Sequence, residues 1–217
     1  MALRWMHDKL QHLSTSDIDS DIVVPVPDSG VAAALGYSEM SKKKFELGLI
    51  RNHYVGRTFI EPTQKIRSFG VKLKLSSTRS IIENKKIILI DDSLVRGTTC
   101  LKIVKMLYNA GAKEVHVRIA CPEIKFPDFY GVDMPSKEEL LAHNKSNAEM
   151  CDYIEAKSLK FLSLDGLYKA LGKGKRNNHY SQFSDHYFTG DYPIKPLDNE
   201  KNIKVDQLSL LSGKSSN

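Results

Sequence analysis

The stretch that decides the fold is Ile87-Ile88-Leu89-Ile90-Asp91-Asp92-Ser93-Leu94-Val95-Arg96-Gly97-Thr98-Thr99. Its first four residues are all apolar, which is typical of a parallel strand buried on both faces of a sheet. Two acids follow the strand directly, and a loop of small residues then leads into a helix that Thr98 and Thr99 can cap. An apolar stripe predicts that this helix continues until Gly111 ends it.

The sequence on either side alternates between strand and helix patterns. Further strands are expected at 21–27, 45–50 and 115–121, with a weaker one at 159–164, and helices at 3–13, 31–40, 136–143, 147–153 and 164–171. Residues 51–67 show no sustained period and are expected to form a long loop, of the kind that often serves as a lid. Such alternation predicts an α/β fold, with an open, mostly parallel sheet flanked by helices and ligands at the carboxyl ends of the strands.

Length and composition set wider limits. The chain has 217 residues, of which 41% are hydrophobic and 27% charged, as expected for a globular protein. We expect an N-terminal helix and linker at 1–20, one domain at 21–171 and a polar extension at 172–217 whose end is poorly ordered. No apolar run is long enough to cross a membrane, and no targeting peptide is evident, so a cytoplasmic location is expected. Three cysteines, Cys100, Cys121 and Cys151, fit neither a disulfide framework nor a zinc site.

The acids and the loop suggest a ligand with two chemical ends. Asp91 and Asp92 can accept hydrogen bonds from vicinal hydroxyls or help to hold Mg²⁺. The loop and the first helical turn offer backbone N–H groups and hydroxyls to a phosphate. A ribose 5-phosphate combines both groups. An acidic pair after a strand can also be a helix N-cap or an acidic pocket, and the pair alone does not decide between these readings.

The whole stretch resembles the phosphoribosyl-diphosphate (PRPP) signature of type I phosphoribosyltransferases. Three further segments, together with this signature, resemble the C-terminal part of the glutamine PRPP amidotransferases. They are Val24-Pro25-Val26-Pro27-Asp28-Ser29-Gly30, then Arg51-Asn52-His53-Tyr54-Val55-Gly56-Arg57-Thr58-Phe59-Ile60, then Pro122-Glu123-Ile124 with Phe129-Tyr130-Gly131-Val132-Asp133-Met134-Pro135. The resemblance runs from about Asp21 to Pro193 and implies a type I phosphoribosyltransferase fold, incomplete at its N-terminus.

The resemblance implies a reaction in which ammonia displaces pyrophosphate from C1 of PRPP to give 5-phosphoribosylamine. It assigns Ser29, Asp91 and Asp92 to a Mg²⁺ site and the loop from Ser93 to Thr99 to the 5-phosphate. It also assigns Arg57 to the pyrophosphate and Tyr54 to the path of ammonia. Purine nucleotides are the implied inhibitors, and a homo-oligomer is the implied assembly.

Two departures from the family pattern matter. The first cysteine is Cys100, so we expect no glutaminase domain in this chain, and ammonia would come from solution or from a separate glutaminase. Some members hold an iron–sulfur cluster with four cysteines. At the corresponding places this chain has Asp128 and residues 179–187, so no cluster is expected, and His179 and His186 are expected to bind no metal.

Three other functions are alternatives to the amidotransferase reaction. The chain can be a fragment or sensor that binds PRPP or purine nucleotide with little or no turnover. A salvage phosphoribosyltransferase is disfavoured because the segment from Tyr54 to Phe59 matches the amidotransferase. Nucleic acid binding is also disfavoured, because the net charge of +6 comes with no helix-turn-helix or aromatic-basic pattern.

Overall fold

The central element of the protein is a five-stranded, entirely parallel sheet. A computed structural model describes residues 18–52, 75–132, 134–177 and 182–194. The strand order is β2-β1-β5-β6-β7. Its strands are β1 (Ile22–Pro25), β2 (Lys44–Phe45), β5 (Lys86–Asp91), β6 (Glu114–Ile119) and β7 (Ser158–Phe161). The predicted α/β fold with a mostly parallel sheet is therefore confirmed, whereas the predicted helix at 3–13 lies outside the described residues.

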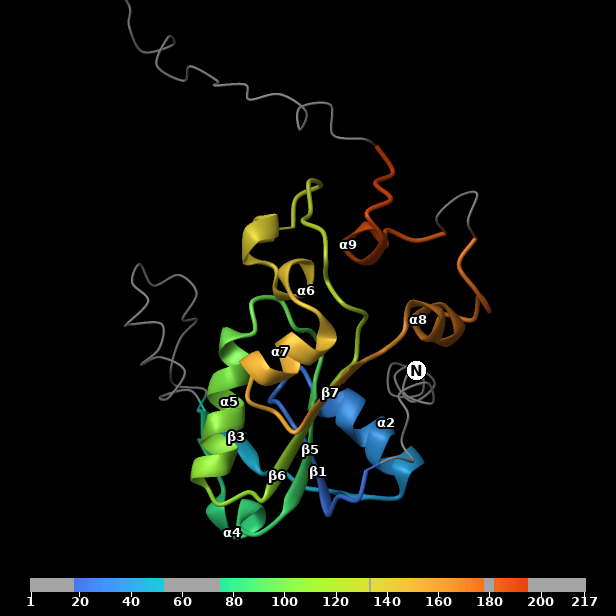
Figure 1. Ribbon diagram of the computed structural model, residues 1–217. Helices are drawn as coiled ribbons and strands as arrows, with labels where there is room; N and C mark the ends of the chain where they lie inside the picture. The colour runs from blue at the N-terminus through green and yellow to red at the C-terminus, as the bar shows by residue number, and fades with distance from the viewer. Residues whose placement is uncertain (1–17, 53–74, 133, 178–181, 195–217) are drawn as a thin grey trace, which may run out of the picture.

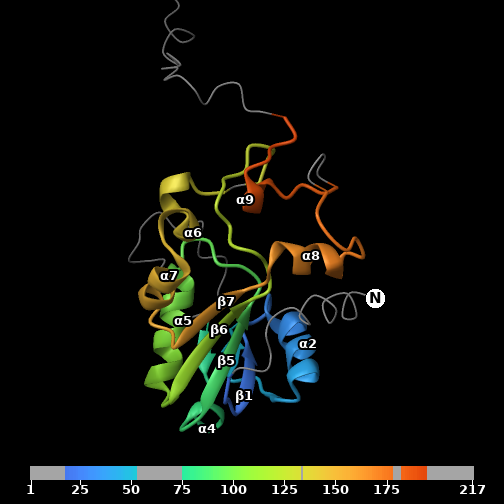
Figure 2. The same ribbon diagram turned by 45° about the vertical axis from the view of Figure 1, so that its right-hand side comes forward.

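Helices cover both faces of the sheet (Figures 1 and 2). One face is covered by α2 (Val31–Ser41) and α8 (Leu164–Ala170), and the other by α5 (Thr98–Asn109) and α7 (Asn147–Tyr153). The apolar run of β5 serves both layers, because Ile87 and Leu89 pack on the α5 side and Ile88 and Ile90 on the α2 side. All four side chains are fully buried, as the unbroken apolar pattern predicts.

The prediction of one strand at 45–50 was wrong. The chain instead forms β2 and then β3 (Leu49–Arg51), which pairs antiparallel with β4 (Leu75–Ser77) in a separate two-stranded sheet. Gly48 lies between these two strands, and a Cβ atom there would come within 2.5 Å of Ile82 Cδ1 in the short helix α4 (Arg79–Ile82). Glycine permits this close packing where the chain leaves the main sheet.

The helix expected at 136–143 is divided in two. A single 3₁₀ turn, η2 (Lys137–Glu139), precedes a short helix, α6 (Leu141–Asn144). Leu140 between them has extended backbone angles and a fully buried side chain. Burial of this leucine interrupts the helix that the local sequence favours.

Sequence analysis missed the short helix α9 (His186–Thr189). Residues around it pack on the loop that follows β6, and the backbone N–H groups of Lys125 and Phe126 both donate to the carbonyl of Tyr187. His186 and Asp128 are buried side by side, with Nε2 2.8 Å from Oδ1. These contacts join segments about 60 positions apart in the sequence, so no local pattern predicts them.

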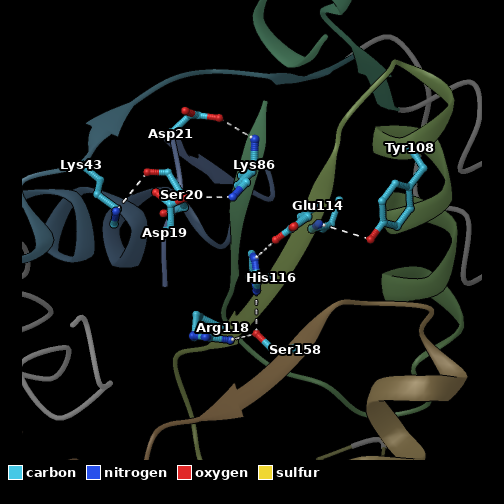
Figure 3. A network of polar contacts seen from close by, with 11 residues as sticks. Asp19, Ser20, Asp21, Lys43, Lys86, Tyr108, Glu114, His116, Arg118 and Ser158 are labelled. Atoms are coloured by element: carbon cyan, nitrogen blue, oxygen red, sulfur yellow. Dashed lines mark hydrogen bonds and ion pairs between the residues drawn. The ribbon is translucent and has the colours of Figure 1, made fainter. Parts of the chain in front are cut away.

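A polar network joins the segment before β1 to β5 and continues across β6 and β7 (Figure 3). The Nζ of Lys86, the first residue of β5, donates to Asp19 Oδ2 at 2.8 Å, and the backbone N–H of Lys86 donates to Asp21 Oδ2 at 2.7 Å. On β6 and β7, His116 bridges Glu114 and Ser158 at 3.1 and 2.9 Å. Arg118 also donates to Ser158 and is almost fully buried. None of the helices in the described ranges is long and apolar enough to cross a membrane.

Candidate functional site

The site is centred on Asp91, the last residue of β5. Its carboxylate lies at the carboxyl edge of the sheet and is 8% exposed. Oδ1 of Asp91 accepts hydrogen bonds from Ser29 Oγ at 3.2 Å and from the backbone N–H of Asp92 at 2.9 Å. Asp92 itself is exposed, so the pair presents one buried and one accessible carboxylate.

The turn after β1 brings Ser29 to this carboxylate. Val26 donates its N–H to the carbonyl of Ile90 at 2.8 Å, and Gly30 donates its N–H to the carbonyl of Val26 at 2.8 Å. A Cβ atom on Gly30 would lie 2.3 Å from the oxygen of Ile90, so only glycine fits there. The turn therefore lies directly against the end of β5.

The electrostatics of Asp91 favour a cation in this site. Burial raises the pKa of Asp91, and the neighbouring negative charge of Asp92 raises it further, to about 7. Hydrogen bonds from Asp92 N–H and Ser29 oppose this increase only in part. A bound cation would stabilise the ionised form of this carboxylate and so lower its pKa.

The oxygen atoms at this site suit Mg²⁺, but they are too few to fill its coordination shell with protein ligands alone. Mg²⁺ typically takes one or two carboxylates and completes its shell with water and substrate phosphates. Asp91 and Asp92 supply two carboxylates and Ser29 a hydroxyl. The described part of the chain contains no group of three or more His, Cys, Asp or Glu residues placed to hold a metal. A site of this type would therefore need its substrate to complete the coordination.

The loop from Ser93 to Gly97 leads directly into α5. Leu94 is buried and holds the loop to the apolar core, while Arg96 and Thr99 are exposed. The expectation that Thr98 or Thr99 caps the helix was wrong, because the N-cap is Gly97, in a left-handed conformation with φ +73°. Glycine has no side chain to cap the helix, so the first backbone N–H groups of α5 are left to a ligand or water.

The predicted site residues divide into two groups. Ser29 and the whole stretch from Asp91 to Thr99 lie together at the carboxyl ends of β1 and β5. Tyr54 and Arg57 lie outside the described residues. Sequence analysis missed two ion pairs at the border of the site. These are Arg51 with Asp28 at 2.8 Å and Arg96 with Glu139 at 3.1 Å.

The sequence and the fold both match known proteins. No protein-family model matches the chain. The amidophosphoribosyltransferase of Rhizobium etli is 58% identical over 198 residues, which is 91% of this chain. The match covers the C-terminal part of such relatives. The chain therefore corresponds to the C-terminal part of the amidophosphoribosyltransferases.

Other amidophosphoribosyltransferases give the same result. The chloroplastic amidophosphoribosyltransferase 1 of Arabidopsis thaliana is 55% identical over 183 residues. The structure of glutamine PRPP amidotransferase from B. subtilis, complexed with ADP and GMP, superposes with a TM-score of 0.77 at 44% identity over 91% of this chain. The fold is thus the type I phosphoribosyltransferase fold. The chain spans 40%, 31% and 43% of the lengths of these three proteins.

Proposed function

We propose that this chain carries the phosphoribosyl-transferring step of an amidophosphoribosyltransferase. In this reaction ammonia attacks C1 of PRPP, a C–N bond forms, and the bond from C1 to the pyrophosphate oxygen breaks. Pyrophosphate leaves with the electron pair, and the new ammonium group loses a proton to give 5-phosphoribosylamine. The observation that supports this proposal most is the position of Asp91 and Asp92 beside the start of α5, in a chain that matches named amidophosphoribosyltransferases.

Each part of PRPP has a suitable partner in the site. The N–H groups at the start of α5 and the loop from Ser93 to Thr99 would bind the 5-phosphate. Asp91 and Asp92 would accept hydrogen bonds from the ribose hydroxyls. These contacts on both sides of the ribose would orient C1 toward ammonia, which lowers the entropic cost of the attack.

Mg²⁺ fits beside Asp91, Asp92 and Ser29, and it would supply positive charge to the departing pyrophosphate. Arg57 is proposed to contact the same pyrophosphate, and Tyr54 is proposed to line the path of ammonia. Both assignments rest on the family resemblance. Purine nucleotides are proposed as inhibitors, since the B. subtilis relative was solved with ADP and GMP. A homo-oligomer and a cytoplasmic location stay predictions.

Pyrophosphate release tests the proposal directly. Purified protein is mixed with PRPP, Mg²⁺ and ammonium chloride, and pyrophosphate and 5-phosphoribosylamine are both quantified. We expect turnover that falls at least about 100-fold in Asp91→Asn and Asp92→Asn, because both change the groups that hold the substrate. If the wild-type protein releases pyrophosphate no faster than the two variants, the proposed catalysis is wrong.

The alternative function is binding of PRPP or purine nucleotide without turnover. This alternative is kept because the match covers only 40% of the length of the Rhizobium etli relative. Calorimetric titration with PRPP and with GMP distinguishes the two functions. Binding without pyrophosphate release supports the alternative, and absence of binding contradicts both.

A further inference from the structure

The loop that is proposed to bind the 5-phosphate is supported from two sides. On one side it continues β5 and enters α5. On the other side the segment from η2 to α7 lies against it, and the N–H of Leu141 donates to the carbonyl of Val95 at 2.9 Å. The second support comes from residues more than 40 positions further along the chain.

An ion pair strengthens this second contact. Arg96 Nε lies 3.1 Å from Glu139 Oε1, and Arg96 Nη2 lies 3.3 Å from Glu139 Oε2. The two parallel contacts fix the plane of the guanidinium against the carboxylate. Both side chains are about half exposed, so the pair is open to solvent and to salt. Glu139 thereby holds the Arg96 side chain against η2.

The same segment limits the space beside Gly97. A Cβ atom on Gly97 would lie 2.6 Å from Leu141 Cδ2 and 3.0 Å from Tyr153 Cε1. The backbone at the N-cap of α5 is therefore packed against α6 and α7. Because the direction of the first N–H groups depends on this backbone, the position of α6 sets the geometry of the anion site.

We propose that Glu139 is a positioning residue for the phosphate loop. It acts through Arg96, and together with the Leu141 N–H it fixes the loop in the conformation that receives the 5-phosphate. The proposal rests on the proposed function of the loop. Glu139 does not lie at the reacting carbon, so its removal should weaken the binding of PRPP and leave the chemical step unchanged.

Glu139→Ala and Glu139→Gln test this role, with Glu138→Gln as the matched control. The control removes the same charge from the neighbouring exposed residue of the same 3₁₀ turn. A half-exposed ion pair makes a modest contribution. We therefore expect the KM for PRPP to increase about threefold in both Glu139 variants, with kcat within about twofold and the control unchanged. Glu139→Asp should recover part of the loss.

Hydrogen exchange provides a readout that does not require turnover. In the substrate-free protein, the amides of residues 92–98 should exchange faster in Glu139→Ala than in Glu138→Gln. Equal exchange and equal KM in the two variants would overturn the proposal. A lower KM in Glu139→Ala would also overturn it, because it would mean that Arg96 binds PRPP better when released. A wild-type protein that does not turn over PRPP counts against the proposed function, and the exchange comparison still tests the positioning role.

Discussion

Gly30 lies against the main-chain oxygen of Ile90 so closely that a Cβ atom would come within 2.3 Å of it. This contact packs the turn after β1 against the carboxyl end of β5. It places Ser29 within hydrogen-bonding distance of Asp91. The two strands are neighbours in the sheet, with Pro25 paired to Ile90. The geometry of the acidic site thus depends on the absence of one methyl group.

Gly30→Ala should therefore displace the turn and reduce turnover. The obstacle is a backbone oxygen that cannot rotate away, and overpacking of this kind typically costs about 1–3 kcal/mol of folding free energy. We expect a lower Tm in thermal unfolding and at least about a tenfold loss of kcat/KM for PRPP.

Gly48→Ala is the matched control for this substitution. A Cβ atom at Gly48 meets the terminal Cδ1 of Ile82 at 2.5 Å, and a side-chain end can move more easily than a backbone oxygen. Its Tm should also fall, but the KM for PRPP should stay close to that of the wild type. Equal losses of activity in both variants would show that general destabilisation, and not the turn beside Asp91, causes the effect.

Asp91→Asn should stabilise the fold while it removes activity. Burial and the charge of Asp92 raise the pKa of Asp91 from 3.8 to about 7, so the ionised carboxylate is unfavourable in the native state. Each pKa unit corresponds to about 1.4 kcal/mol, which gives a gain of up to about 4 kcal/mol above pH 7. An asparagine oxygen can still accept the hydrogen bonds from Ser29 and Asp92 N–H.

The pH dependence of this gain follows from the same pKa. Between pH 3.8 and about 7 the native protein holds a proton that the unfolded chain releases, so wild-type stability from this group falls as the pH rises. The difference in Tm between Asp91→Asn and wild type should be small at pH 4 and largest above pH 7. Asp92→Asn, which removes only the neighbouring charge, should give a smaller gain. A constant difference across this range would contradict the assigned pKa.

Much of the fold and of the site follows from local sequence. The apolar run from Ile87 to Ile90 predicted a buried strand, and the residues that follow it predicted the loop that leads into α5, where the candidate site lies. The periodicity of residues 147–153 predicted α7 with its bounds. In these cases the chain signals its structure within a few residues.

The features that sequence reasoning missed depend on distant contacts. Glu139 meets Arg96 across 43 positions, and His186 meets Asp128 across 58. The interrupted helix at Leu140 and the short strand β3 likewise result from packing that a local pattern does not contain. Propensity is a weak guide wherever tertiary contacts decide the backbone.

Asp128→Asn should loosen the segment around α9. Burial alone would raise the pKa of Asp128, but hydrogen bonds from the N–H of Val132, from His186, from the N–H of Tyr130 and from Tyr187 hold it at about 2. The ionised form is thus favoured in the native state, and its contribution to stability is present above pH 4 and lost as the pH falls toward 2. An amide keeps the shape of the side chain but loses the charge.

Hydrogen exchange of residues 182–194 at pH 7 measures this effect, with Asp165→Asn on α8 as an exposed control. We expect exchange in this segment to be at least about threefold faster in Asp128→Asn and unchanged in the control. Exchange in β5 and β6 should not change, because the contact lies outside the central sheet. Unchanged exchange at 182–194 would mean that the aromatic contacts of His186 with Tyr130 and Tyr192 hold the segment without the carboxylate.

His116, in the polar network of Figure 3, should make the fold sensitive to mild acid. Burial lowers the pKa of His116, and the hydrogen bond that His116 donates to the Glu114 carboxylate opposes this only in part. The native state therefore favours the neutral imidazole, while the unfolded chain takes up a proton near pH 6.5. Stability from this residue is present above pH 6.5 and falls as the pH decreases below it.

His116→Gln does not titrate, so its Tm should fall less between pH 7 and pH 5 than that of the wild type. His143→Gln, at an exposed position of α6, is the control for the loss of a histidine. If His116→Gln and wild type lose the same Tm over this range, protonation of His116 does not contribute to the acid sensitivity of the fold.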